Sequence, residues 1–578
     1  MKLQTFGSAK TISFHKKGYF FVCLCIVLFV RLIYIFSFPL NFGGDASVYY
    51  TMIVNQHSNL LMAPGYPFFM MLPYEWLHRL WSKIWTIPMD HAFSSWWQSS
   101  TLRGDILGAK VLESDFSWGS VFQNHDFILF QHAIALLALF CGFKLVRKYF
   151  GFPIGIIFLG LAGLSPLSLE WPSCSLPEWL QGSFLVFWLY FADRAREAAG
   201  IRKLGLYGLL GLFAAGGCLI KFNGFPIFAT LFIGLFFLDR ESIRKTGLKL
   251  LVSASTACTL VAVFVMSYHF PTTGTTALSM NTWPLADKVF QFLPHPSISP
   301  DMGIHSKRLL AMHKDLPKHN EEVLSPAPYF RHLNAVDTRV PYQEKLAPLM
   351  QRTESELDHY LTVHGYDSIY EQQPALRVAY YIGLQEYCSL LRGVYIEAAT
   401  KYPFLFLQDT ANNFFHDFLM KENSYFFRPQ WDEVQAGRDH AQPSRWGFVK
   451  FLWPHERYVC YHENVVWQPG VWFFTKWQAL WPSTRFLWIL AFVAFGVAVN
   501  DLQREEKRKQ SYIIVFLFLL ALMFVWVSNM AWIFRLKEYE FIRAIPALLA
   551  AVGIYQSIQV LRQVGRWSIF RLKKQVIQ

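Results

Sequence analysis

Charged residues are scarce in this chain. Asp, Glu, Lys and Arg make up 16% of its 578 residues, against roughly 25% in a typical soluble protein. Hydrophobic residues make up 53% and aromatic residues 18%, and the many Phe and Trp side chains suit the aromatic belts of a membrane interface. This composition excludes an ordinary soluble protein and predicts a membrane protein with several spans.

Other features are also missing. The sequence has no internal repeat, no low-complexity tract, and no Cys and His residues at the spacing of a zinc site. It lacks the paired hydrophobic halves that many transporters show. The net charge is +13, but the Lys and Arg residues cluster in short segments between apolar runs. That distribution argues against a nucleic-acid-binding protein.

A membrane-spanning helix needs about 20 mostly apolar residues, and the sequence contains about ten such runs. They predict an all-α polytopic membrane protein with about 10 transmembrane helices, and about 11–13 as the upper estimate. We expect an N-terminal membrane domain (1–269) with its first external loop at 40–126, a large, mostly helical external domain (270–484), and C-terminal transmembrane helices (485–578). The expected spans are 19–39, 127–146, 152–170, 176–192, 204–221, 225–238, 248–268, 485–500, 511–532 and 541–561.

Basic residues mark every second connection between these runs. Lys16 and Lys17 precede the first run, Arg147 and Lys148 follow the second, and Arg571 lies beyond the last. Because Lys and Arg near span ends stay on the cytoplasmic side, we expect both termini in the cytoplasm and the protein in the bacterial inner (plasma) membrane. The first run is too long for a signal peptide and no small-x-small cleavage site follows it, which predicts an uncleaved anchor.

The long segment 270–484 does not have the composition of a linker. The stretch from Tyr402 to Met420 is aromatic and amphipathic, which predicts a helix at the membrane surface. Six of the eight cysteines lie in or beside apolar runs, where a thiol is ordinary packing. Only Cys388 and Cys460 fall in this segment, and a disulfide between them in an oxidising compartment stays open.

The most informative stretch follows the first apolar run. It reads Gly-Gly-Asp at 43–45, places Tyr49 four residues after Asp45, and continues with Pro-Gly-Tyr-Pro at 64–67. An acidic residue thus stands at the mouth of the first expected span, and a proline-rich segment turns the chain back towards the bilayer. A Pro-Gly-Tyr-Pro turn alone is common in loops and does not indicate a function. It is informative here because it follows an acidic residue and a tyrosine at the end of the first expected span.

Further residues extend this pattern along the chain. Gln131 opens the second run, Glu178 lies at the start of the fourth, Lys221 ends the fifth, and Arg543 precedes the last. Together with the first loop, these motifs resemble the GT-C class of membrane glycosyltransferases. They are most similar to the protein mannosyltransferase and lipid A aminoarabinose transferase relatives, which use polyprenyl-phosphate sugars. The resemblance covers most of the chain.

The resemblance implies that a sugar moves, with inversion, from a polyprenyl-phosphate donor to an acceptor hydroxyl on a protein, lipid or polysaccharide at the outer face. The leaving phosphate needs a nearby cation, and the acceptor hydroxyl needs a carboxylate to take its proton. The implied site residues are Asp45 as catalytic base, Lys221 and Arg543 as donor-phosphate ligands, and Glu178, Tyr49 and Tyr66 in supporting roles.

We expect no cofactor. Some relatives use a divalent metal, but a lone first-loop Asp without a neighbouring acid does not make a divalent site. The expected partners are the lipid-linked sugar, its acceptor and membrane lipids, without nucleic acid. Four histidines are expected to be surface or packing residues rather than ligands, namely His57, His78, His125 and His132.

Simpler interpretations of the same residues stay open. Asp45 would merely cap a helix, Lys221 would extend to the interface, and Glu178 would suit the start of any helix. Arg31 lies inside the first run, where a charge is costly, and either a carboxylate partner or extension to the interface would explain it. The alternative functions are a polytopic transporter or flippase, and a membrane transferase of the O-antigen-ligase type.

Overall fold

The structure is a computed structural model of the whole chain. It describes residues 6–37, 53, 65–71, 73, 118–174, 176–221, 224–239, 243–273, 300–315, 384–418, 427–429, 458–460, 472–474, 476–477, 481, 484–531 and 542–577. Six helices within these ranges are long and apolar enough to cross a membrane, or seven spans if one bent helix pair is counted. The protein is therefore an integral membrane protein built from helices.

Each apolar run that was expected to span the membrane is helical, but the run 152–170 is divided by a bend into two helices, α7 and α8. The six helices that pass as spans lie in α1, α6, α10, α12, α27 and α29. The count of about ten spans stays a prediction, because α9, α11 and α26 are not among these six. The helix α9 carries charges at both ends, and α11 and α26 are short. The bounds are α1 (Phe6–Ser37), α6 (Trp118–Phe150), α7 (Phe152–Gly163), α8 (Pro166–Glu170), α9 (Glu178–Glu197), α10 (Gly200–Ile220), α11 (Phe225–Asp239), α12 (Ile243–Phe264), α26 (Thr484–Asp501), α27 (Arg508–Ala531) and α29 (Ala544–Ile577).

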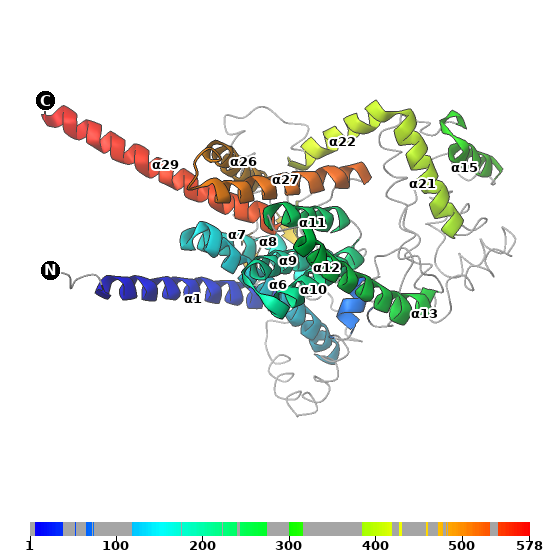
Figure 1. Cartoon of the computed structure of the whole chain (residues 1–578), viewed down its shortest axis with the longest axis horizontal. Helices are drawn as coiled ribbons and strands as arrows, with labels where there is room; N and C mark the ends of the chain where they lie inside the picture. Colours follow the sequence, from blue (N-terminus) through cyan, green and yellow to red (C-terminus); the bar gives the residue numbers. More distant parts are fainter. Residues whose placement is uncertain are drawn as a thin grey trace.

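Both chain ends lie on the same side of the molecule. Figure 1 shows the N-terminus of α1 and the C-terminus of α29 on one side, and the helices α15 (Ile304–Asp315) and α21 (Leu384–Lys401) on the opposite side. Termini on one side agree with an even number of crossings. Which side faces the cytoplasm stays a prediction from the basic residues.

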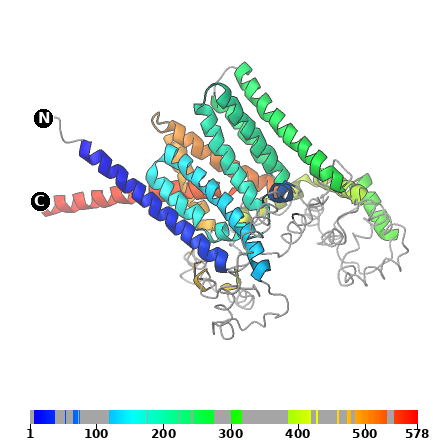
Figure 2. The ribbon, with the colours of Figure 1, turned by 90° about the horizontal axis from the view of Figure 1, so that it is seen from below.

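Close helix packing brings α10 and α12 together, and they run side by side in Figure 2. A Cβ atom at Gly211 would lie 2.9 Å from Cα of Ser253, so only glycine allows this approach. The hydroxyl of Ser253 donates to the carbonyl of Tyr207 at 2.7 Å. Small residues and hydroxyl contacts of this kind are typical where helices associate in a membrane.

The bent pair is α7 with the following segment 166–173, which turns by 63°. The turn falls at Ser165, because proline at 166 disfavours helical backbone in the residue before it, and Ser165 has φ −57° and ψ 133°. The hydroxyl of Ser168 donates to the carbonyl of Ser165 at 2.7 Å. The indole of Trp477 donates to the carbonyl of Leu164 at 2.9 Å. The carbonyls that the break releases are thus paired.

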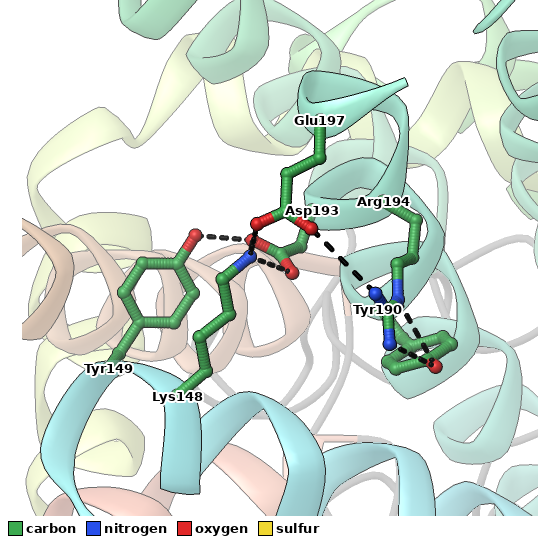
Figure 3. Close-up of polar contacts among 6 residues, drawn as sticks. All are labelled: Lys148, Tyr149, Tyr190, Asp193, Arg194 and Glu197. Atoms are coloured by element: carbon green, nitrogen blue, oxygen red, sulfur yellow. Dashed lines mark hydrogen bonds and ion pairs between the residues drawn. The ribbon is translucent and has the colours of Figure 1, made fainter.

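A polar network joins α6 to α9 (Figure 3). The Nζ atom of Lys148 lies 2.6 Å from Oδ2 of Asp193 and 2.5 Å from Oε1 of Glu197. The hydroxyl of Tyr149 donates to Oδ1 of Asp193 at 2.5 Å. The side-chain amide of Gln510 on α27 donates to the Tyr149 carbonyl at 2.8 Å. This network ties three helices together.

The described residues between 270 and 484 are mostly helical. They include α21, which packs on α15, and α22, whose exposed apolar side chains Phe404, Leu405 and Leu407 suit the predicted location at the membrane surface. Two short strands pair antiparallel. The side chains of Cys388 and Cys460 lie outside the described residues, and the limits of the external domain stay a prediction. The further bounds are α13 (Phe270–Thr273), η4 (Pro300–Met302), α22 (Pro403–Phe418), β1 (Phe427–Pro429) and β2 (Tyr458–Cys460).

Candidate functional site

Lys221 and Glu178 form an ion pair at one end of the helical bundle. The Nζ atom of Lys221 lies 2.6 Å from Oε1 of Glu178, and the side chains are 20% and 1% exposed respectively. Glu178 is the first residue of α9, and Lys221 directly follows the last residue of α10. We call this part of the bundle the Lys221 end. The sequence predicted separate roles for these residues, and the structure brings them into direct contact.

Gln181 fixes the backbone that carries Lys221. It lies one turn after Glu178 on α9, and its side-chain amide donates to the carbonyls of Gly217 at 2.9 Å and of Lys221 at 2.8 Å. The last carbonyls of a helix have no partner within the helix, so Gln181 satisfies two groups at the end of α10. The helix α9 therefore holds both the main chain and the charged side chain of Lys221.

The Pro-Gly-Tyr-Pro segment packs against this same helix end. Residues 65–71 are helical, and a Cβ atom at Gly65 would lie 2.6 Å from the backbone nitrogen of Ile220 and closer still to the carbonyl group of Leu219. Only a residue without a side chain permits such backbone contact. The first-loop motif and Lys221, far apart in the sequence, are thus neighbours.

Tyr66 anchors the segment in the bundle. Its side chain is fully buried, and its hydroxyl donates to Oε1 of Gln131 at 2.7 Å. The amide of Gln131 in turn donates to the carbonyl of Pro172 at 2.9 Å. The Tyr66 ring stands edge-on to Trp179, with centroids 6.5 Å apart. These contacts give Tyr66 a positioning role in the loop.

Arg31 pairs with His132. The NH1 group of Arg31 lies 3.0 Å from Nδ1 of His132, and Nε2 of His132 lies 3.0 Å from the hydroxyl of Ser173. Arg31 and His132 are each 2% exposed. A guanidinium has no acceptor atom, so Nδ1 is the acceptor and Nε2 carries the proton that Ser173 receives. His132 is a packing residue, as expected, but with a defined polar role.

Arg31 and Arg543 line one pocket between α1, α6, α7, α9 and the start of α29. The pocket is small, with a volume of about 50 Å³ that water can enter. Arg31 comes from α1, and Arg543 directly precedes α29. The other described lining residues are uncharged, and Trp179 and Ser183 on α9 are among them. The structure thus brings Arg543 together with Arg31, and it brings Lys221 together with Glu178.

Asp45 and Tyr49 lie outside the described residues, so the predicted base and its neighbouring tyrosine stay predictions. Within the described ranges, no group of three or more His, Cys, Asp and Glu side chains is arranged to hold a metal ion. Sequence reasoning missed Gln181 and Ser173. A glutamine one turn after Glu178 in an apolar run was the available signal for Gln181, and nothing in the sequence pointed to Ser173.

No known protein family and no curated protein matches the sequence. Among solved structures, the chain is similar to a crystal structure of ArnT from Cupriavidus metallidurans in the apo state. The two are 10% identical, the match covers 91% of this chain and 78% of that chain, and the TM-score is 0.31. A likeness at this level assigns no activity. The fold defines a polytopic helical membrane protein, and its function is argued from its residues.

Proposed function

We propose that the protein is a membrane glycosyltransferase that moves a sugar from a polyprenyl-phosphate donor to an acceptor hydroxyl at the outer face of the membrane. The supporting observation is the contact of Gly65 with the backbone of Leu219 and Ile220. This contact places the segment that follows the Asp45 loop directly beside the helix end that carries Lys221. Gly65 and Lys221 lie far apart in the sequence, and their proximity at one end of the bundle supports the proposal.

Lys221 is the proposed ligand of the donor phosphate at this end. Its ammonium group has three donors, and one of them is engaged by Glu178 at 2.6 Å. An ammonium held in this way can donate to a phosphate oxygen without moving. Negative charge grows on the leaving phosphate during transfer, and a cation already in position stabilises that charge without reorganisation. Glu178 therefore acts as a positioning residue for Lys221.

Asp45 is the proposed general base. In the reaction, the acceptor oxygen forms a bond to the anomeric carbon while the bond between that carbon and the phosphate oxygen breaks. The acceptor proton passes to the carboxylate of Asp45, and polyprenyl phosphate leaves. A single displacement of this kind inverts the configuration of the sugar. Tyr49 supports the base, and Tyr66 supports the loop through its bond to Gln131.

The decisive experiment is transfer by the purified full chain with a polyprenyl-phosphate sugar. Asp45→Asn keeps the size of the side chain but removes the base, so activity falls by about 10²–10⁴-fold while thermal stability changes little. Glu505→Gln serves as the matched control, because it also converts an acid to an amide but lies, exposed, in the connection between α26 and α27. Activity of the Asp45→Asn protein within a few-fold of the unmodified chain would refute the assignment.

A further inference from the structure

We propose that Lys144 and Arg147, near the end of α6, bind the head group of an anionic phospholipid in the leaflet nearest the N-terminus of α1. The inference goes beyond the proposed transfer reaction and does not depend on it. Gln131, which holds Tyr66 in the candidate site, precedes Lys144 on α6 by about 20 Å along the helix axis. The head group bound here is therefore separate from the phosphate of the sugar donor.

One stripe of residues along α6 is apolar in its first part and basic at its end. Residues three or four positions apart lie on the same face of a helix. The stripe consists of Ala133, Leu137, Phe140, Lys144 and Arg147. Leu137 is 56% exposed, and both basic side chains are exposed as well. An apolar surface that leads to two cations matches the acyl chains and the anionic head group of one phospholipid.

A third basic residue at this helix end, Lys148, has the partners that the other two lack. Its Nζ atom lies 2.6 Å from Oδ2 of Asp193 and 2.5 Å from Oε1 of Glu197. In the part of the chain that the structure describes, no carboxylate lies within ion-pair distance of Lys144 or Arg147. The neighbouring helices α1 and α7 contain no Asp or Glu at all. An anion from the surrounding lipid can therefore compensate the two charges.

Phenylalanine rings hold both cations in place. The Nζ atom of Lys144 lies 4.2 Å from the ring centroid of Phe140, and Cζ of Arg147 lies 6.0 Å from the ring centroid of Phe152 on α7. Such contacts attract a cation to the face of a ring but do not neutralise its charge. The ammonium group and the guanidinium group keep N–H donors for the oxygen atoms of a phosphate.

The two cations lie at the depth where the apolar part of α1 begins. The ring of Phe20 on α1 stacks on Phe143 with centroids 4.6 Å apart, and its centroid lies 6.1 Å from that of Phe140. The apolar window of α1 starts at Gly18, and that of α6 ends at Phe150. The ends of these windows mark the boundary of the hydrocarbon core, where lipid head groups begin. Basic sites between helices at this boundary bind anionic head groups.

The test measures lipid binding to the purified full chain in detergent by native mass spectrometry. The probes are dioctanoyl phosphatidylglycerol, which is anionic, and dioctanoyl phosphatidylcholine, which has the same chains but no net charge. We expect phosphatidylglycerol to bind at least about 10-fold more tightly, because two basic residues act on its charge. Lys144→Gln and Arg147→Gln should each weaken its binding by about 5-fold, and the double variant by at least about 10-fold.

The matched control is Lys307→Gln. Lys307 is an exposed lysine on α15, which lies on the side of the molecule opposite the chain termini (Figure 1). This variant loses the same charge and should bind phosphatidylglycerol normally. Equal binding of the two lipids by the unmodified chain would overturn the proposal, because Lys144 and Arg147 would then merely extend to the interface. Normal phosphatidylglycerol binding by the double variant would overturn it as well.

Two further measurements separate charge from folding and a lipid from a free anion. On the unmodified chain, phosphatidylglycerol binding should weaken as the salt concentration rises from about 0.1 M to about 1 M, because the screening length falls from about 10 Å to about 3 Å. This measurement needs no variant, and binding that is independent of salt would contradict the proposal. Inorganic phosphate at millimolar concentration should not displace the lipid, because it has no chains for the apolar part of the stripe. Displacement would refute a lipid as the ligand.

Discussion

Glu178 is buried at the start of α9 and its carboxylate lies 2.6 Å from Nζ of Lys221. The pair gives Lys221 a structural task in addition to its proposed contact with the donor phosphate. Removing one partner of a buried ion pair leaves an uncompensated charge, which costs about 3–5 kcal/mol. A simple loss of activity in a Lys221 variant would therefore not show that Lys221 binds phosphate. The two tasks have to be separated by a second substitution.

The first prediction separates them. Lys221→Met keeps the length of the side chain but leaves Glu178 buried without its cation, so the free energy of unfolding should fall by about 3–5 kcal/mol. Adding Glu178→Gln should recover most of that stability, because the buried charge is then gone. Transfer should stay low in the double variant, since the phosphate ligand is still missing. Unfolding titrations and transfer assays on the same preparations check both statements. Recovery of activity together with stability would show that Lys221 only neutralises Glu178.

The second prediction concerns the contact between Gly65 and the end of α10. Gly65→Ala places a Cβ atom against the backbone of Leu219 and Ile220, which cannot move aside as a side chain would. We expect the loop segment to shift away from Lys221 and transfer to fall by at least about 10-fold, in line with the sensitivity of catalysis to small misplacements. The matched control is Gly205→Ala on α10, where a Cβ atom meets nothing within 4 Å. That variant should keep its activity and gain up to about 1 kcal/mol of stability. Equal activity in the two alanine variants would contradict the prediction.

The sequence predicted the helices well and the polar contacts between them poorly, for a physical reason. Apolar runs report burial in lipid or protein directly, so every expected span is helical, and the span 152–170 is the one that bends and divides into two helices. Partners such as Arg31 and His132 are 101 positions apart, and no local periodicity relates them. The break at Ser165 was visible as a proline. Its consequence, that Ser173 meets His132 and Pro172 meets Gln131, depends on tertiary packing.

Sequence motifs predicted which residues belong to the candidate site, but not how those residues contact one another. The first-loop segment, Glu178 and Lys221 were chosen from residue type and position, and the structure brings these three together. Their mutual contacts were not predictable, because an ion pair and two residues with separate roles are compatible with the same sequence. Arg543 was chosen as a phosphate ligand beside Lys221, whereas in the structure it shares a pocket with Arg31.

The third prediction is a pH dependence in the segment 300–315. Glu397 on α21 accepts hydrogen bonds from the backbone N–H groups of His305 and Ser306, at 2.8 and 2.9 Å, and from the Ser306 hydroxyl at 2.7 Å. Burial alone would raise the pKa of Glu397, but these bonds to the charged carboxylate outweigh it and lower the pKa below its usual 4.5. A lowered pKa in the folded state means that the stabilisation is complete above pH 4.5 and is lost as the pH falls through the folded-state pKa.

Hydrogen exchange checks this expectation. Protection factors of the amides in α15 should be constant from about pH 7 to pH 5 and should decrease at lower pH. Glu397→Gln removes the titrating group, so its protection should be weaker at neutral pH and nearly independent of pH over the same range. Protection in the unmodified chain that rises on acidification would contradict the assigned direction of the pKa.

The last prediction is the orientation of the whole molecule, on which the site of the reaction depends. The chain termini lie on one side of the molecule, while α15 and α21 lie on the other (Figure 1). Lys and Arg residues near span ends resist translocation, and they mark every second connection between the apolar runs, at positions such as Arg147 and Lys148. We therefore expect a reporter fused after Lys203 to be cytoplasmic and one fused after Thr338 to be external. A cytoplasmic signal at Thr338 would place the loop after α1 and Lys221 at the inner leaflet. The donor lipid would then have to be drawn from the cytoplasmic side, and transfer at the outer face would be ruled out.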